Sequence, residues 1–160
     1  MSSTLAPTVA PTIKVKKLHT DAKLPCYSHS GPWGDLAADL TAVAAVIHTP
    51  AGTPGCTQAV STGIALELPS THGALVEDRS GLALKGLTTL AGVIDPGYRG
   101  EIKVVVTNLT PAPFAIAVGD RIAQLRIVQR IEATFEEVGE LVEASLESFR
   151  GAAGFGSTGV

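Results

Sequence analysis

Short segments rich in Val and Ile recur along this 160-residue chain, each followed by Pro, Gly, Asp or Asn. The segment TIKVKKL at 12–18 alternates polar and apolar residues, as a half-buried strand does. Similar segments lie at 42–48, 63–68, 73–78, 101–109, 114–118 and 121–131. Turn sequences such as TPAGTPG and LPSTHG separate them. Strands at such short intervals predict an all-β barrel or jelly roll, because an α/β fold alternates strands with longer helical segments.

Two segments depart from this strand pattern. SGLALKG at 80–86 is a helix candidate, with Ser80 as its N-cap. The segment EVGELVEASLESF at 137–149 has a helical composition, but its apolar residues are irregularly spaced, so we expect it to be mostly extended or irregular.

Composition narrows the class of protein. The length suits a single domain, and 45% apolar against 17% charged residues indicates that another subunit covers part of the surface. A net charge of −3 without a basic stripe argues against a nucleic-acid polymer as partner. Cys26 and Cys56 form no disulfide framework or metal cluster and fit two reduced thiols. With no long apolar run and no secretory signal, we expect a cytoplasmic protein without a membrane partner.

The segment EDRSGLALKG places three residues suited to an anion side by side. Arg79 offers a planar guanidinium fork, Ser80 a hydroxyl, and Gly81 a backbone amide that a ligand can approach closely. A helix starting here would add free amides and the positive end of its dipole. Alternatively, Ser80 is only a helix cap and Arg79 a surface charge.

The segment AGVIDPGYRGEI predicts a β-hairpin, with Pro96 fixing φ and Gly97 in the left-handed position. Asp95 at the hairpin mouth has the chemistry of a general base for water. Alternatively, Asp95 caps the turn and Tyr98 packs on it.

A third segment, GDRIAQL at 119–125, is a turn that opens a strand. Asp120 and Arg121 could pair locally, and Gln124 could be an outward polar residue. The C-terminal sequence RGAAGFGSTGV is too rich in glycine to order by itself, because glycine loses much conformational entropy on folding.

In order, GDLAADL, EDRSGLA, AGVIDPGYRGEI, GDRIAQL and RGAAGFGSTG resemble the five motifs of the homotrimeric deoxyuridine triphosphatases (dUTPases), over about residues 13–160. The resemblance implies hydrolysis of dUTP to dUMP and pyrophosphate with Mg²⁺, which keeps uracil out of DNA and supplies dUMP for dTMP synthesis. It also implies a jelly-roll-like, distorted β-barrel subunit in a homotrimer. The expected organisation is a disordered lead-in (1–11), a β domain (12–140) and a C-terminal arm with a glycine-rich lid (141–160), which reaches a neighbouring subunit.

The same resemblance assigns roles to single residues. Asp95 is the general base, and Asp39 holds Mg²⁺ through the water shell of the ion. The residues implied to contact the substrate are Arg79, Ser80, Gly81, Thr89, Val93, Ile94, Tyr98, Lys103, Gln124, Arg150, Phe155, Gly156 and Ser157. Among these, Val93 and Ile94 read uracil through the backbone, Tyr98 packs under the deoxyribose, and the C-terminal Phe155 stacks on the base.

The chain departs from the family pattern at two positions. Ala37 stands where motif one usually has Gly, which an alanine tolerates if its φ is negative. Thr89 stands where bacterial members often have Asn.

Two alternative functions remain. A dCTP deaminase of the same fold needs a catalytic Glu on the strand after the turn, where this chain has Val105. The other is a nucleotide-sensing regulator with weak or no catalysis. Against it stand the retained residues Asp39, Asp95, Tyr98, Gln124, Arg150 and Phe155.

Overall fold

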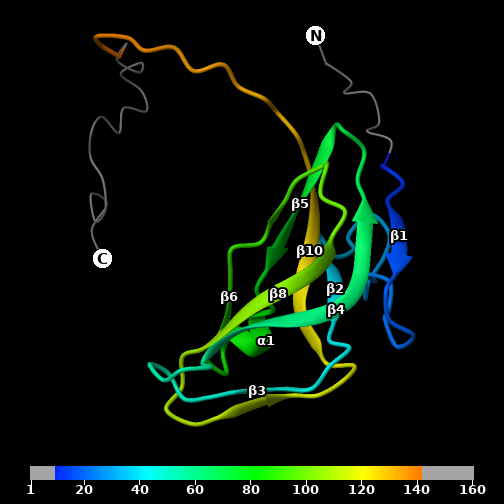
Figure 1. Cartoon of the computed structure of the whole chain (residues 1–160). Coiled ribbons are helices and arrows are strands. Elements are labelled where there is room, and N and C mark those ends of the chain that lie inside the picture. Colours follow the sequence, from blue (N-terminus) through cyan, green and yellow to red (C-terminus); the bar gives the residue numbers. More distant parts are fainter. Residues whose placement is uncertain (1–9, 142–160) are drawn as a thin grey trace.

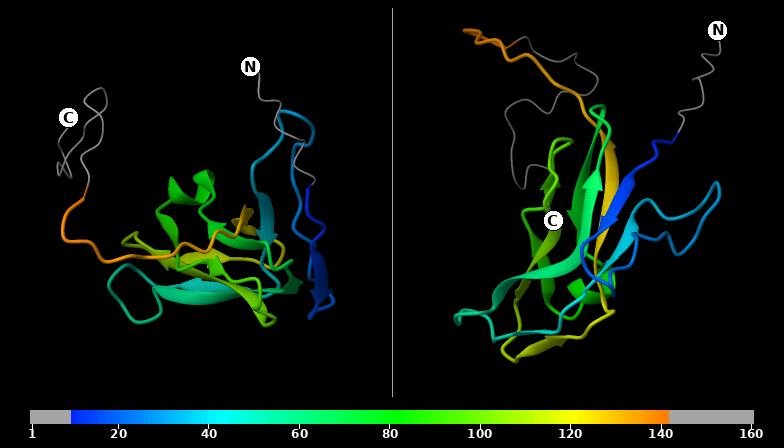
Figure 2. Two further views of the ribbon diagram at one scale, coloured as in Figure 1. Left: turned by 90° about the horizontal axis from the view of Figure 1, so that it is seen from above. Right: turned by 45° about the vertical axis from the view of Figure 1, so that its right-hand side comes forward.

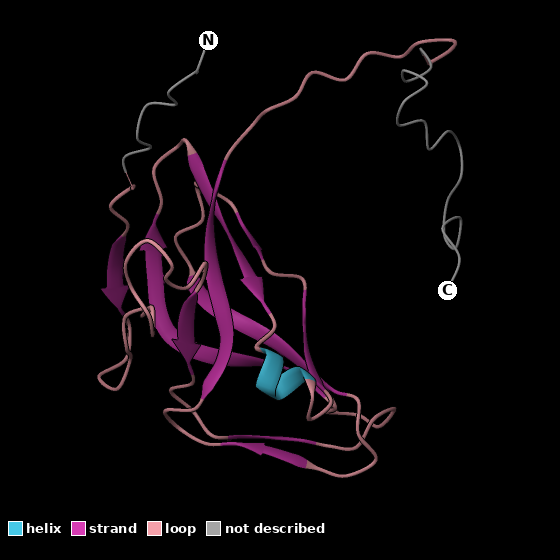
Figure 3. Ribbon diagram, turned by 180° about the vertical axis from the view of Figure 1, so that it is seen from behind, coloured by secondary structure: helices cyan, strands magenta, loops and turns pink. Residues whose placement is uncertain are grey.

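The computed structural model describes residues 10–141. This part contains ten strands and one four-residue helix. The elements are β1 (Lys14–Lys17), β2 (Ala38–Thr41), β3 (Val46–His48), β4 (Thr57–Glu67), β5 (His72–Glu77), α1 (Ser80–Ala83), β6 (Leu87–Leu90), β7 (Val93–Ile94), β8 (Glu101–Asn108), β9 (Phe114–Ile116) and β10 (Arg121–Gln129). Figure 1 labels most of them, and Figure 3 shows how far strands dominate the fold.

The strands form two four-stranded sheets, in the orders β1-β4-β8-β6 and β2-β10-β5-β7, and a small third sheet of β3 and β9. Every pairing is antiparallel. Non-consecutive neighbours such as β10 and β5 come from strands that cross between the sheets, as in a jelly roll. The all-β prediction is therefore confirmed.

The hydrophobic core lies between the two large sheets, whose layers can be followed in the two views of Figure 2. Strand β8 shows the pattern most clearly, because Ile102, Val104 and Val106 are buried at every second position. Ile122 and Leu125 of β10 cover them from the second sheet within the same core cluster. Strand β6 is an edge strand of the first sheet, and β7 is an edge strand of the second sheet.

The helix is present but begins differently from the prediction. Ser80 is its first residue, and Arg79 occupies the N-cap position with extended backbone angles and no capping side-chain hydrogen bond. A helix of one turn carries only a small dipole, so the predicted helix-terminus anion site reduces to the free amides of that turn.

The predicted hairpin at Asp95 is wrong in its pairing. Strand β7 pairs with β5, whereas β8 pairs with β4 and β6, so the turn between β7 and β8 connects the two sheets. The Tyr98 amide donates to the Asp95 carbonyl across 3.1 Å and closes the turn. Gly97 does not have a positive φ, which a type I turn does not require.

Residues 130–141 follow β10 without helix or strand and run away from the sheets, as the orange segment of Figure 1 shows. Ile131, Phe135 and Leu141 in this segment are more than four-fifths exposed. The predicted contacts at Arg150, Phe155, Gly156 and Ser157 lie outside the described residues. Between residues 10 and 141, no helix has the length and apolar character needed to cross a membrane.

Candidate active site

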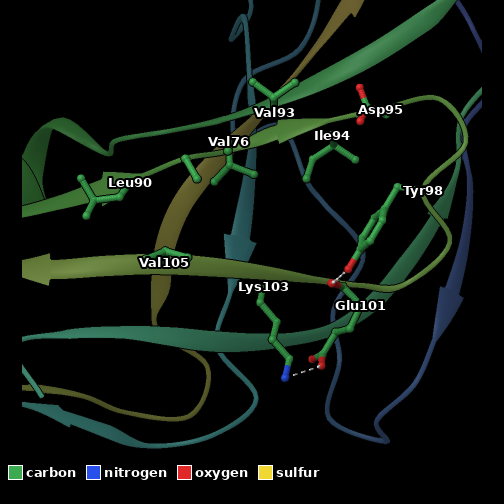
Figure 4. A pocket seen from close by; sticks show the side chains of 11 residues that line it. Val76, Leu90, Val93, Ile94, Asp95, Tyr98, Glu101, Lys103 and Val105 are labelled. Atoms are coloured by element: carbon green, nitrogen blue, oxygen red, sulfur yellow. Dashed lines mark hydrogen bonds and ion pairs between the residues drawn. The ribbon is translucent and has the colours of Figure 1, made fainter.

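A cavity of about 590 Å³ opens between β7 and β8 (Figure 4). Its lining comes from β5, from the end of β6 through β7 to the turn after it, and from β8: Val76, Leu90, Ala91, Gly92, Val93, Ile94, Asp95, Tyr98, Glu101, Lys103 and Val105. Five of the predicted site residues are among them. One edge of β7 pairs with β5, and its other edge is not paired with any strand of residues 10–141, so its backbone groups can meet a ligand.

Strand β7 is held in place by the two residues before it. Ala91 and Gly92 have φ of 61° and 107°, a conformation that favours glycine. The Val76 amide donates to the Gly92 carbonyl across 2.8 Å. A Cβ on Gly92 would lie 2.6 Å from the Val76 carbonyl oxygen, so only glycine fits this approach.

Asp95 follows β7 at the mouth of the cavity and is exposed. Its carboxylate makes no hydrogen bond or ion pair with any side chain of residues 10–141. In Figure 4, Ile94 points toward Tyr98 and Val105, whereas Val93 and Asp95 leave the strand on the other side. The Asp95 carboxylate is therefore available to a water molecule or a ligand.

Tyr98 and its turn are fixed by short contacts. The Tyr98 hydroxyl donates to the Glu101 carbonyl across 3.1 Å, and the Arg99 guanidinium donates to the Pro96 carbonyl across 2.7 Å. The Tyr98 ring lies against Gly100, where a Cβ would be 2.5 Å from the tyrosine hydroxyl oxygen. This packing places the ring along the wall of the cavity.

Lys103 lies beside Glu101, which also lines the cavity. Its Nζ lies 3.6 Å from Glu101 Oε2, and Glu101 Oε1 accepts a hydrogen bond from the Gly63 amide. Both carboxylate oxygens of Glu101 are thus engaged, and Asp95 is the free carboxylate among the residues that line this cavity.

A second group of predicted residues gathers around Asp39 on β2. The Asp39 carboxylate is 8% exposed; its Oδ1 accepts from Arg79 Nε across 2.8 Å, and its Oδ2 accepts from Arg121 Nη1 across 3.0 Å. The Ser28 hydroxyl donates to Oδ2 across 3.2 Å. Gln124 on β10 stands opposite Asp39 in register. We call Asp39, Arg79, Arg121 and Ser28 the Asp39 cluster.

Opposing effects act on the Asp39 carboxyl group. Partial burial raises its pKa, but the hydrogen bonds from Arg79 and Arg121 and the positive charge of Arg79 lower it by more. The pKa of Asp39 therefore lies below its usual value, and the group is an anion near neutral pH.

Sequence reasoning did not find two members of this cluster. Local pairing of Arg121 with Asp120 was one alternative, but the Asp120 carboxylate accepts from the Ala117 amide, and Arg121 donates to Asp39. Ser28 lies in a loop with no motif around it. The partners of Asp39 come from positions up to 82 residues away in the chain, so no local pattern reveals them.

Thr89 lies on β6. It does not line the cavity, and its hydroxyl and amide both donate to the Asp78 carboxylate. Ser80 and Gly81 are exposed, and a Cβ on Gly81 would meet nothing within 4 Å. The amides of this turn are open to a ligand. The φ of Ala37 is not positive, so alanine fits there without strain.

The Asp39 cluster has the chemistry to contact Mg²⁺ through water. Asp39 lines a cavity of about 330 Å³, and its Oδ1 accepts a single hydrogen bond, which leaves one lone pair. Residues 10–141 contain no group of three acidic, His or Cys side chains that could hold a metal directly. The arrangement fits contact with a cation through one of its water ligands, because Mg²⁺ keeps several waters.

Comparison with known proteins decides the family. The dUTPase family model matches residues 21–159, most of the chain. The chain belongs to the dUTPase family. The deoxyuridine 5'-triphosphate nucleotidohydrolase of Solibacter usitatus is 46% identical over 151 residues, covering 92% of this chain and 95% of that protein. The Thermobifida fusca enzyme of the same name is 45% identical, over 92% of this chain and 78% of its own.

Solved structures agree with this assignment. The dUTPase of Staphylococcus bacteriophage 80alpha with dUpNHpp superposes with a TM-score of 0.77 at 26% identity, over 94% of this chain and all of that chain. A G164S mutant of the phage enzyme, also with dUpNHpp, has a TM-score of 0.76 at 25% identity. The fold is that of a dUTPase subunit.

Proposed function

We propose that this chain hydrolyses dUTP to dUMP and pyrophosphate, with uracil and deoxyribose in the cavity beside β7 and with Asp95 as the general base. The observation that carries the proposal is the free Asp95 carboxylate at the mouth of that cavity, in a chain that belongs to the dUTPase family.

The base is read by the backbone of Val93 and Ile94. Uracil and cytosine differ in the direction of their hydrogen bonds along one edge, so a backbone that satisfies one leaves buried groups unpaired with the other. Such a site discriminates by roughly 10⁴-fold or more. The Tyr98 ring, fixed against Gly100, packs under the sugar and leaves no room for a 2′-hydroxyl group.

In the chemical step, the water oxygen attacks the α-phosphorus while Asp95 accepts a proton from that water. The bond from the α-phosphorus to the oxygen that bridges it to the β-phosphate breaks, and pyrophosphate leaves. Arg79, the open amides of Ser80 and Gly81, and Gln124 hold the phosphates, with Arg121 beside them. Asp39 would hold Mg²⁺ through the water ligands of the ion, which would supply positive charge for the triphosphate and the leaving group.

Within residues 10–141, Asp39 and Arg79 line cavities other than the one beside β7. The lining of the cavity beside β7 includes none of Asp39, Arg79, Ser80, Gly81 and Gln124. We infer that chains associate as a homotrimer in which the phosphate-binding residues of one subunit complete the nucleoside cavity of another. The exposed apolar residues of 130–141 support an arm that packs on a neighbouring subunit and carries Arg150, Phe155, Gly156 and Ser157 to that site.

A dCTP deaminase of the same fold is the nearest alternative. Val105, in the position where a deaminase needs its catalytic Glu, lines the cavity and cannot carry a proton. Glu101 also lines it, but both of its carboxylate oxygens are engaged. These contacts favour hydrolysis over deamination.

The test is the variant Asp95→Asn, which keeps the shape of the side chain and removes the base. We expect kcat for dUTP to fall by about 10²–10⁴, while dUpNHpp binds with nearly unchanged affinity. An Asp95→Asn enzyme that keeps more than a tenth of the wild-type kcat refutes the assignment of Asp95.

A further inference from the structure

Asp78 lies between β5 and the Arg79–Gly81 turn, and its carboxylate accepts three hydrogen bonds from β6. The Thr89 amide and hydroxyl donate to Oδ1 across 2.5 and 2.7 Å, and the Thr88 hydroxyl donates to Oδ2 across 2.8 Å. We call Asp78, Thr88 and Thr89 the Asp78 latch. None of the three lines the cavity beside β7 or belongs to the Asp39 cluster.

The position of β6 explains how one carboxylate reaches two adjacent threonines. Neighbouring side chains of a strand point to opposite faces, but β6 is an edge strand that pairs with β8 on one side. A carboxylate beyond the free edge can meet both hydroxyls and the outward amide between them. Asp78 takes that place, so it also satisfies an edge amide that would otherwise face water.

The segment that Asp78 holds has little packing of its own. Helix α1 has no buried residue, although Leu82 packs partly against the core. Ser80 and Gly81 are exposed. Besides Leu82, the hydrogen bonds of Arg79 to Asp39 and to the Arg121 carbonyl tie the turn to the sheets on one side, and the Asp78 latch ties it on the other.

We propose that the Asp78 latch is a positioning device that fixes the Arg79–Gly81 turn for the triphosphate. This inference rests on the proposed function, in which the turn binds phosphate. A triphosphate binds best when the amides and the guanidinium that contact it are held at fixed separations. If the turn is mobile before binding, part of the binding free energy is lost in ordering it, and the affinity is lower. Asp78, Thr88 and Thr89 do not touch the substrate; they act through the turn.

The latch is tested by steady-state kinetics with dUTP on Asp78→Ala, Thr89→Val and Thr89→Ser. We expect KM to rise about tenfold in Asp78→Ala, the size of one lost charge-assisted hydrogen bond, and severalfold in Thr89→Val. Thr89→Ser keeps the hydroxyl and should restore the wild-type KM. In all three variants kcat should stay within about threefold, because Asp95 and its water are untouched. Thr57→Val is the matched control, since its hydroxyl bonds Thr107 and not Asp78, and its KM should not change.

Hydrogen exchange of the nucleotide-free protein gives a second readout. The Thr89 amide and the amides of residues 80–84 should exchange faster in Asp78→Ala and Thr89→Val than in the wild type. An unchanged KM in both variants, or unchanged exchange at these amides, overturns the latch. A wild-type protein that releases no pyrophosphate from dUTP refutes the proposed function instead, so the two failures can be told apart.

Discussion

Replacing Asp39 by Asn should weaken the fold measurably even without Mg²⁺, because Asp39 joins β2 to two guanidinium groups. An asparagine cannot accept from both Arg79 and Arg121, since one end of its amide is a donor. The bond to Arg79, whose side chain is 23% exposed, should contribute about 1.5–3 kcal/mol. The bond to Arg121, 53% exposed, should add about 0–1 kcal/mol after solvent screening. We therefore expect the free energy of unfolding to fall by about 1.5–4 kcal/mol at pH 7.

The effect should depend on pH with a definite sign. The pKa of Asp39 is lowered in the folded protein, so its contribution is full above the unfolded pKa and is lost as pH falls through the folded pKa. The difference between wild type and Asp39→Asn should therefore shrink steadily as the pH is lowered below about 4.

Urea unfolding in EDTA, at fixed protein concentration and between pH 7 and pH 3, measures this difference. Glu67→Gln is the control, because its ion pair with Lys14 is exposed on both sides and should contribute little to stability after solvent screening. A difference of less than 0.5 kcal/mol for Asp39→Asn, or one that does not change with pH, refutes this account of the Asp39 cluster.

Three further outcomes follow from the geometry of the site. Gly92→Ala should lower the free energy of unfolding by about 1–3 kcal/mol and abolish dUpNHpp binding. The alanine Cβ would meet the Val76 carbonyl, and a φ of 107° is unfavourable for alanine. Calorimetry measures the stability, and ligand titration measures the binding. Gly100→Ala should displace the Tyr98 ring and lower the ratio of kcat/KM for dUTP to that for UTP, with an unchanged ratio counting against the sugar-packing role. Deletion of residues 151–160 should leave a folded assembly, as measured by size-exclusion chromatography. The kcat/KM for dUTP should fall by a factor between several and a hundred. Unchanged kinetics would exclude a role for this segment as a lid.

The sequence predicts most strands because their signal is local. The alternation in β8 follows from Ile102, Val104 and Val106 facing the core, and the turn residues mark where strands end. Strands β2 and β6 were not foreseen, because their sequences ADLT and LTTL lack the Val and Ile residues that marked the expected strands. The first half of β4 was missed too, because its buried positions shift at a bulge around Gly63.

Pairing and side-chain partners were beyond the sequence for a different reason. Whether β7 joins β5 or β8 depends on the whole sandwich, and the Asp-Pro-Gly turn suits either arrangement. The partner of Arg121, Asp39, is 82 residues away in the chain. Thr89 contacts Asp78 across the edge of a strand, and no sequence motif predicts that contact. The motifs indicated which residues matter in the family, and the structure shows which of them one chain brings together.

Pyrophosphate release from dUTP, compared with dCTP, dTTP and UTP under the same conditions with Mg²⁺, tests the central claim most directly. The proposed base reading by Val93 and Ile94 and sugar packing by Tyr98 predict rapid release from dUTP and release from the other three that is lower by orders of magnitude. Comparable release from dCTP or UTP, or ammonia formed from dCTP, would contradict the proposed function.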